Sequence, residues 1–156
     1  IVLPANGSYR ISVEAADNQT VGPFTIGLSE LGDSTPIAFN TPVNAAIDLI
    51  AEVDLYTFTG TTGTTVTVDY STPTVIDRPD HVVRLELVRP NGTVATSTPS
   101  CGTTGRIDNA LLDANGTWTV RVRSYEFWYN CGYGADTNLL TGLYTITVCN
   151  ALPCPP

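Results

Sequence analysis

The sequence predicts an all-β protein, an antiparallel jelly roll or β-sandwich with an additional N-terminal β-hairpin. No window of helical length has apolar residues with a 3.6-residue period, whereas several short stretches alternate between apolar and polar residues. These stretches are rich in Thr, Val, Ile and Tyr, and Gly, Pro and Asn-Gly turn signals separate them at short intervals. Strands of this length and spacing are typical of two packed antiparallel sheets.

One motif occurs twice, at residues 3–13 and again at 112–122, an offset of 112 − 3 = 109 residues. In each copy an Asn-Gly turn precedes one aromatic and two aliphatic residues at alternate positions, which predicts a strand with one buried face. These positions are Tyr9, Ile11 and Val13 in the first copy, and Trp118, Val120 and Val122 in the second. A second strand follows each copy, at 22–28 and 142–148. We therefore predict one complete unit preceded by the closing hairpin of another.

Residues 1–31 are predicted to form that hairpin. A two-stranded hairpin is not stable alone in water, so its apolar face must be covered by another chain or by further sequence. This assembly face comprises Tyr9, Ile11, Val13, Phe24, Ile26 and Leu28. Residues 32–44, with two Pro and several turn formers, are predicted to be a linker.

The sandwich domain is predicted to span 45–149, and 150–156 form a tail rich in Pro and Cys. Alternation predicts its first strands at 54–58, 65–70 and 83–87. A return strand starts at 93–96 after the turn Arg89-Pro90-Asn91-Gly92. Residues 71–81 are expected to be an irregular loop.

The composition excludes several function classes. A formal net charge of −8 argues against nucleic acid and anionic membrane surfaces as partners. The absence of Lys excludes a Lys–Asn isopeptide bond, a Schiff base and a P-loop. The sequence has no apolar run long enough to span a bilayer and does not begin with Met. We expect it to be a processed or excised piece of a longer protein.

The four Cys residues predict two disulfides and an extracellular or cell-surface location. Zinc is disfavoured because there is no C-x-x-C spacing and only one His. Of the three pairings that four Cys allow, we favour Cys101–Cys131 with Cys149–Cys154. The first would join two loops and stabilise the fold by about 3–4 kcal/mol in the chain-entropy model.

Four segments together resemble the bacterial pre-peptidase C-terminal domain family: residues 54–58, 85–92, 114–122 and 141–148. The resemblance spans roughly residues 40–149, and 1–31 resemble the end of a preceding copy. It implies a jelly-roll sandwich that serves as a non-catalytic module of secreted hydrolases and surface proteins. Some members bind calcium or polymers such as collagen or polysaccharide. The Cys pairs and a longer final loop depart from the family pattern.

That final loop contains five aromatic residues: Tyr125, Phe127, Trp128, Tyr129 and Tyr133. Relative to the first copy of the motif, the loop is 120 − 109 = 11 residues longer, since the following Gly22 and Gly142 are 120 apart. The rings could fold back over an open end of the sandwich. They could instead contact a protein partner or stack on sugar rings.

Signals for catalysis, metal binding and modification are weak. His81 is the only imidazole and no G-x-S-x-G pattern occurs, so we expect no enzyme. Asp77 and Asp80, or Asp48, Glu52 and Asp54, could supply calcium ligands. No D-x-D-x-D-G loop is present, so calcium rests mainly on the family resemblance and no other cofactor is expected. N-glycosylation sequons occur at Asn6, Asn18, Asn91 and Asn115, of which only Asn18 lies outside an Asn-Gly turn.

Two functions fit these observations. The first is a non-enzymatic extracellular structural or adhesion module, which assembles with other copies of itself into a filament or surface layer through its N-terminal hairpin. The second is an accessory domain that binds a polysaccharide or protein polymer for a larger secreted hydrolase. Neither involves nucleic acid or insertion into a membrane.

Overall fold

The computed structural model describes residues 7–13, 22, 26, 33–48, 52–73, 82–124, 142–151 and 153–154. Within these residues it contains strands and no helix, so no helix there could cross a membrane. In chain order the strands are β1 (Thr35–Pro36), β2 (Val43–Ile47), β3 (Val53–Gly60), β4 (Thr65–Ser71), β5 (Val82–Val88), β6 (Val94–Cys101), β7 (Thr104–Leu111), β8 (Gly116–Ser124) and β9 (Gly142–Cys149).

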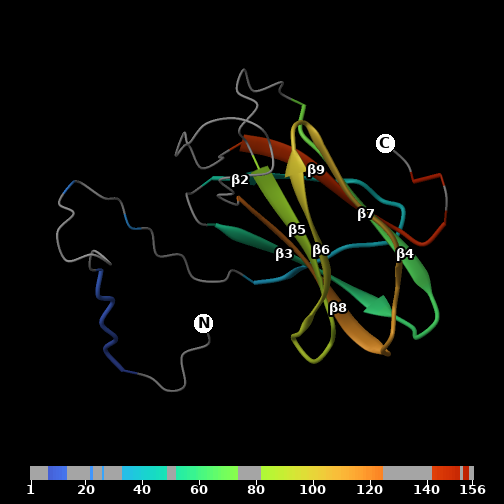
Figure 1. Ribbon diagram of the computed structural model, residues 1–156. Coiled ribbons are helices and arrows are strands. Elements are labelled where there is room, and N and C mark those ends of the chain that lie inside the picture. The colour runs from blue at the N-terminus through green and yellow to red at the C-terminus, as the bar shows by residue number, and fades with distance from the viewer. Residues whose placement is uncertain are drawn as a thin grey trace.

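The strands form two sheets that pack face to face as a sandwich (Figure 1). Sheet A has the order β1-β3-β8-β5-β6, and sheet B has the order β2-β9-β4-β7. Every pairing is antiparallel except that of β1, which runs parallel to β3. The predicted all-β antiparallel sandwich is confirmed.

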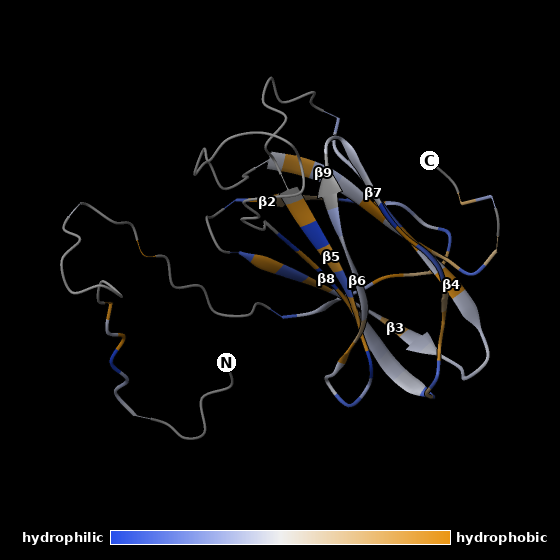
Figure 2. Ribbon diagram, in the orientation of Figure 1, coloured by the Kyte–Doolittle hydropathy of each residue, from blue (hydrophilic) through white to orange (hydrophobic). Residues whose placement is uncertain are grey.

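Strand β8, the second copy of the repeated motif, lies at the centre of sheet A between β3 and β5. Its residues Trp118, Val120 and Val122 are fully buried, as the alternation predicts. Gly116 begins the strand with a φ of 130°, a conformation that favours glycine and explains the Asn-Gly step. Figure 2 shows the same alternation of apolar and polar residues along β5 and β8.

The second half of the core comes from sheet B. Val68 pairs with Val148 and Tyr70 with Ile146, so β4 and β9 present a continuous apolar face to sheet A. Burying one such side chain contributes roughly 1.5–3 kcal/mol to stability. The core residues with the lowest exposure are Val66, Val68, Leu85, Leu87, Leu112, Trp118, Val120, Val122, Ile146 and Val148.

The strand pairing corrects the prediction of hairpins. Strands β8 and β9 belong to different sheets: β8 pairs with β3 and β5, whereas β9 pairs with β2 and β4. Alternation shows which face of a strand is buried but not which strand lies beside it. The prediction that the two strands of the complete unit form one hairpin is therefore wrong.

Residues 7–13 form no strand in the structure, so the predicted N-terminal hairpin is not formed there. Tyr9, Ile11 and Val13 are 50%, 56% and 55% exposed, and Ile26 is 53% exposed. Phe24 and Leu28 of the predicted assembly face lie outside the described residues. Residues 7–13 form no strand because a strand needs a neighbouring strand to satisfy its backbone groups and to cover its apolar face.

The predicted linker 32–44 is also corrected, because part of it is built into the sandwich. It contributes β1 and the start of β2, and Ile37 is buried in the core. The Ile37 amide donates to the Thr57 carbonyl at 2.9 Å, and the Phe39 ring packs edge-on against Phe58. Pro36 is tolerated because β1 is an edge strand, so proline did not indicate a linker here.

Candidate binding groove between the edge strands β6 and β7

The two sheets are open along one side of the sandwich, where β6 is the edge of sheet A and β7 is the edge of sheet B. Residues 102–103 connect these strands, with Gly102 at a φ of 127° that permits the sharp turn. A groove of about 330 Å³ lies between the strands. Its lining residues are Leu87, Arg89, Ala95, Thr96, Thr98, Arg106, Ile107, Asp108, Ala110 and Leu111.

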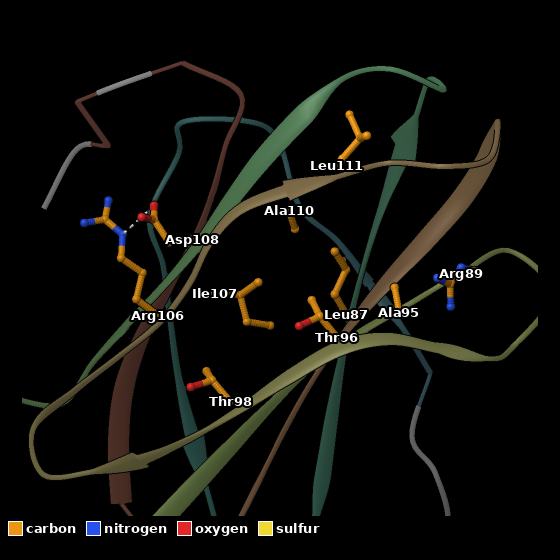
Figure 3. Close-up of a pocket in the computed structure, with 10 residues that line it drawn as sticks. All are labelled: Leu87, Arg89, Ala95, Thr96, Thr98, Arg106, Ile107, Asp108, Ala110 and Leu111. Carbon is orange, nitrogen blue, oxygen red and sulfur yellow. Dashed lines mark ion pairs between the residues drawn. The ribbon is translucent and has the colours of Figure 1, made fainter.

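The floor of the groove is apolar and its walls are mixed. Leu87 from β5 and Ile107 from β7 are buried, and Figure 3 shows them between the two edge strands. Thr96 and Thr98 line the β6 side with hydroxyl groups. Leu111 is 64% exposed, a large value for a leucine that lines a groove.

Both arginines of the groove are held by carboxylates. Arg106 Nε lies 3.0 Å from Asp69 Oδ1 and 3.7 Å from Asp108 Oδ1. Arg89 Nε lies 2.9 Å from Asp113 Oδ2, and Arg89 Nη1 donates to the Val94 carbonyl at 3.0 Å. The pKa of Asp69 lies above its ordinary value, because burial raises it by more than the Arg106 charge lowers it. The charged side chains of the groove are therefore held in place by ion pairs within the chain.

A β-bulge interrupts each edge strand. The β5–β6 register shifts between Leu87 and Val88, and the β4–β7 register shifts between Val66 and Val68. In the second bulge Asn109 adopts a left-handed φ of 49°, and its amide donates to Thr67 Oγ1 at 3.3 Å. Bulges twist an edge strand and hinder indiscriminate sheet extension.

The groove has the chemistry of a binding site. It offers an apolar floor, hydroxyl groups, two arginines and the outer backbone edges of β6 and β7, a combination that suits an extended peptide segment. Its lining residues include Thr96, Thr98 and Asp108 but no His, Cys, Ser or Glu. The groove could not be predicted from the sequence. The only local signal was the low apolar content of residues 94–101, which marks an edge strand.

A second polar cluster lies on the outer face of sheet A. Glu86 is only 5% exposed and is surrounded by arginines from β5 and β8. Arg123 Nη2 donates to Glu86 Oε1 at 2.8 Å, and Arg84 Nε lies 3.2 Å from the same oxygen. Arg121 Nη1 lies 3.5 Å from Oε2. Burial raises the pKa of Glu86, but the Arg123 hydrogen bond and the three charges outweigh it, so the pKa lies below its ordinary value.

This cluster gives a pH-dependent prediction. Because the pKa of Glu86 is lowered on folding, its contribution to stability is complete above the ordinary glutamate range and is lost as the pH falls through the folded value. We expect Glu86→Gln to lower the free energy of unfolding by about 2 kcal/mol at pH 7, and by progressively less toward pH 3. Urea unfolding across this pH range measures the difference.

The matched control is Asp113→Asn, which removes a carboxylate from the exposed pair with Arg89. We expect that change to cost less than about 1 kcal/mol, because the side chain of Asp113 is 51% exposed and solvent screens the pair. Equal losses for the two variants, or a Glu86→Gln loss that does not depend on pH, would contradict the prediction.

Calcium ligation by Asp48, Glu52 and Asp54 does not fit the structure. Within the part of the chain that the structure describes, these carboxylates do not converge as three metal ligands would. Glu52 Oε2 accepts the Asp48 amide at 2.6 Å, and Asp54 Oδ2 accepts the Tyr144 hydroxyl at 2.5 Å. Burial raises the pKa of Asp54, as do the Glu52 and Asp48 charges, against the lowering effect of the Tyr144 bond. Tyr144 in turn lies 2.6 Å from the Tyr56 hydroxyl, which explains Asp54 as part of a buried network.

Cys149 and Cys154 are joined by a disulfide, with their Cα atoms 5.6 Å apart. This is the pairing that the sequence favours, and it ties the tail to β9. Asp69 lies near both sulfurs, but a disulfide offers no thiolate to a metal. The side chain of Cys101 and all of Cys131 lie outside the described residues.

The two described sequon asparagines have structural roles. Asn91 Oδ1 accepts from the amide and the hydroxyl of Thr93, at 3.0 and 2.7 Å, and so closes the β5–β6 turn. Asn115 Oδ1 accepts from the Thr62 amide at 2.8 Å. The remaining predicted site residues lie outside the described residues: Asn6, Asn18, Asp77, Asp80, Tyr125, Phe127, Trp128, Tyr129 and Tyr133.

No protein-family model matches the sequence, and no curated protein matches it. Among solved structures, the chain is similar to the pre-peptidase C-terminal domain of collagenase from Bacillus anthracis. The two share 14% identity over 78% of this chain and 99% of that domain, with a TM-score of 0.49. It is also similar to PliG, a periplasmic inhibitor of g-type lysozyme from Aeromonas hydrophila, with 13% identity over 74% of this chain and 95% of PliG and a TM-score of 0.46. The first of these belongs to the domain family that the sequence resembles.

Proposed function

We propose that this chain is a non-enzymatic extracellular structural module that assembles with other copies of itself through residues 1–31. The observation that carries the proposal is the exposure of Ile11 and Val13, at 56% and 55%. In the repeated motif they correspond to Val120 and Val122. Those two residues are fully buried in β8, which lies between β3 and β5. A sequence with the pattern of an inner strand is thus exposed on this chain. Burial of that face requires a second surface.

One further feature supports this function. The Cys149–Cys154 disulfide is typical of proteins that work outside the reducing cytosol. A segment of one copy that docks on a different surface of the next copy makes a heterologous contact, which propagates into a filament or layer if it does not close on itself. No reaction is needed for such a role.

The test uses two variants of the full chain with the same change in charge. Ile11→Asp with Val13→Asp places two carboxylates on the apolar face of the segment, and Ser8→Asp with Ser12→Asp places two on the opposite face. We expect the native chain and the serine variant to form polymers and the apolar-face variant to remain a monomer of about 16.6 kDa. Analytical ultracentrifugation and electron microscopy measure this, and circular dichroism verifies that the sandwich is folded.

A native chain that is monomeric at high concentration would overturn the proposal. The function would then be sought in binding to an external polymer, the alternative that the sequence leaves open. Equal polymer formation by the two variants would also overturn it, because the alternating face would then have no role.

A further inference from the structure

The edge strands of the two sheets are candidate docking sites for a second copy. Sheet A ends at β1 and β6, and sheet B ends at β2 and β7. Among the described residues, the β6 and β7 edges flank a groove whose floor is apolar, formed by Leu87 and Ile107. An added strand at this side could form backbone hydrogen bonds with one edge and place alternate side chains over that floor.

The edge strands β6 and β7 differ in how well they can pair with an added strand. β6 contains Pro99, which has no backbone N–H, whereas β7 contains no proline. β7 has eight residues and is about 26 Å long, and a seven-residue segment such as 7–13 would be about 23 Å long when extended. β7 is therefore the better edge for this segment. The bulge at Asn109 limits regular pairing, so recognition depends on the side chains of the groove as well as on the backbone.

Charge favours the same contact. The whole chain carries −8, so two copies repel each other over most of their surfaces. The proposed occupant, residues 7–13, contains Arg10 as its only charged residue and so carries a net charge of +1. The groove lining contains Asp108 as well as Arg89 and Arg106, and carboxylates of the same chain already pair with both arginines. A segment with one positive charge is therefore less repelled by the acidic neighbour than the rest of the chain is.

We propose that residues 7–13 of a second copy occupy the groove between β6 and β7, extending sheet B along β7 and placing Ile11 and Val13 over Leu87 and Ile107. This inference rests on the proposed function and adds the acceptor site. Leu111, exposed at the groove, gains cover when the segment binds. Each copy then donates one segment and accepts another, which is the arrangement of an open chain of subunits.

The first test disables the acceptor with a matched control. Leu111→Asp introduces a carboxylate at the groove, and Leu143→Asp introduces one at a leucine of β9 with nearly the same exposure, 64% against 65%. We expect Leu111→Asp to abolish polymers, or to raise the concentration needed for them at least tenfold, and Leu143→Asp to polymerise as the native chain does. Both substitutions are at exposed positions, so the sandwich should stay folded.

The second test mixes two variants that are each unable to polymerise. The variant with Ile11→Asp and Val13→Asp keeps its groove, and the Leu111→Asp variant keeps its segment. In a mixture, the intact segment of one should enter the intact groove of the other and form dimers that cannot extend. Mass determination by light scattering should give twice the monomer mass, with no larger species.

The outcomes separate the two proposals. A native chain without polymers overturns the proposed function and the groove with it. Polymers that form equally well with Leu111→Asp, or a mixture that stays monomeric, overturn the groove alone and leave assembly through another surface. A cross-link would locate the segment directly. We expect a disulfide to form between a chain with Ile11→Cys and a second chain with Thr96→Cys. No disulfide should form when the second chain carries Leu143→Cys instead.

Discussion

Replacing Trp118 with alanine is expected to lower the free energy of unfolding by about 4 kcal/mol. Trp118 is fully buried at the start of β8, the central strand of sheet A, and pairs with Phe58 of β3. Its indole Nε1 donates to the Ala114 carbonyl at 3.0 Å, which ties the strand to the preceding turn. Alanine would remove that hydrogen bond and leave a cavity in a core that can collapse only in part.

Urea denaturation followed by circular dichroism measures this loss, because the signal does not depend on the tryptophan that is removed. Thr119→Ala is the control, since the neighbouring residue points to the other face of the strand and is only half-buried. We expect that change to stay within about 0.5 kcal/mol of the native value. A loss below about 1 kcal/mol for Trp118→Ala would show that β8 is not the centre of the core.

The strands themselves could be predicted from the sequence because burial has a local period. Trp118, Val120 and Val122 alternate with polar residues, and the structure buries all three. The Asn91-Gly92 turn is likewise local, and it connects β5 to β6 as expected. These features depend on residues within a few positions of one another, so a single sequence contains them.

The pairing of the strands could not be predicted in the same way. β8 and β9 follow each other in the chain, yet they lie in different sheets, and nothing in their own residues states this. Pro36 contributed to the wrong prediction of a linker. Proline argues against a strand only where that strand must form hydrogen bonds on both sides, and β1 is an edge strand. Both errors concern which segments become neighbours, and that is decided by the packing of the whole domain.

The candidate groove could not be predicted from the sequence for the same reason. Leu87 and Ile107 come from strands of opposite sheets, and Arg89 and Arg106 carry no motif that joins them. The segment that we propose as its occupant is visible in the sequence, because Ile11 and Val13 repeat a pattern found elsewhere in the chain. One sequence can thus reveal an exposed apolar segment more readily than the surface that receives it.

The second large effect is expected at Gly60, the residue of β3 that pairs with Gly116. A Cβ atom there would overlap Trp118 Cδ1 and lie 2.7 Å from Leu112 Cδ1, and both side chains are fully buried. We expect Gly60→Ala to lower the free energy of unfolding by about 3 kcal/mol, because the core has no room for an added methyl group.

A double-mutant cycle identifies the cause. In the Trp118→Ala background the overlap with the indole is gone, and Leu112 Cδ1 can move into the vacated space. Gly60→Ala should then cost less than about 1 kcal/mol, which gives a coupling free energy of about 2 kcal/mol. Gly63→Ala is the control: Gly63 has a φ of 87° with nothing within 4 Å of an added Cβ, so its cost of about 1 kcal/mol arises from the backbone. That cost should be the same with and without Trp118. Independent effects of Gly60→Ala and Trp118→Ala would mean that the glycine is required by its backbone and that the packing of β3 against the Trp118 ring does not select it.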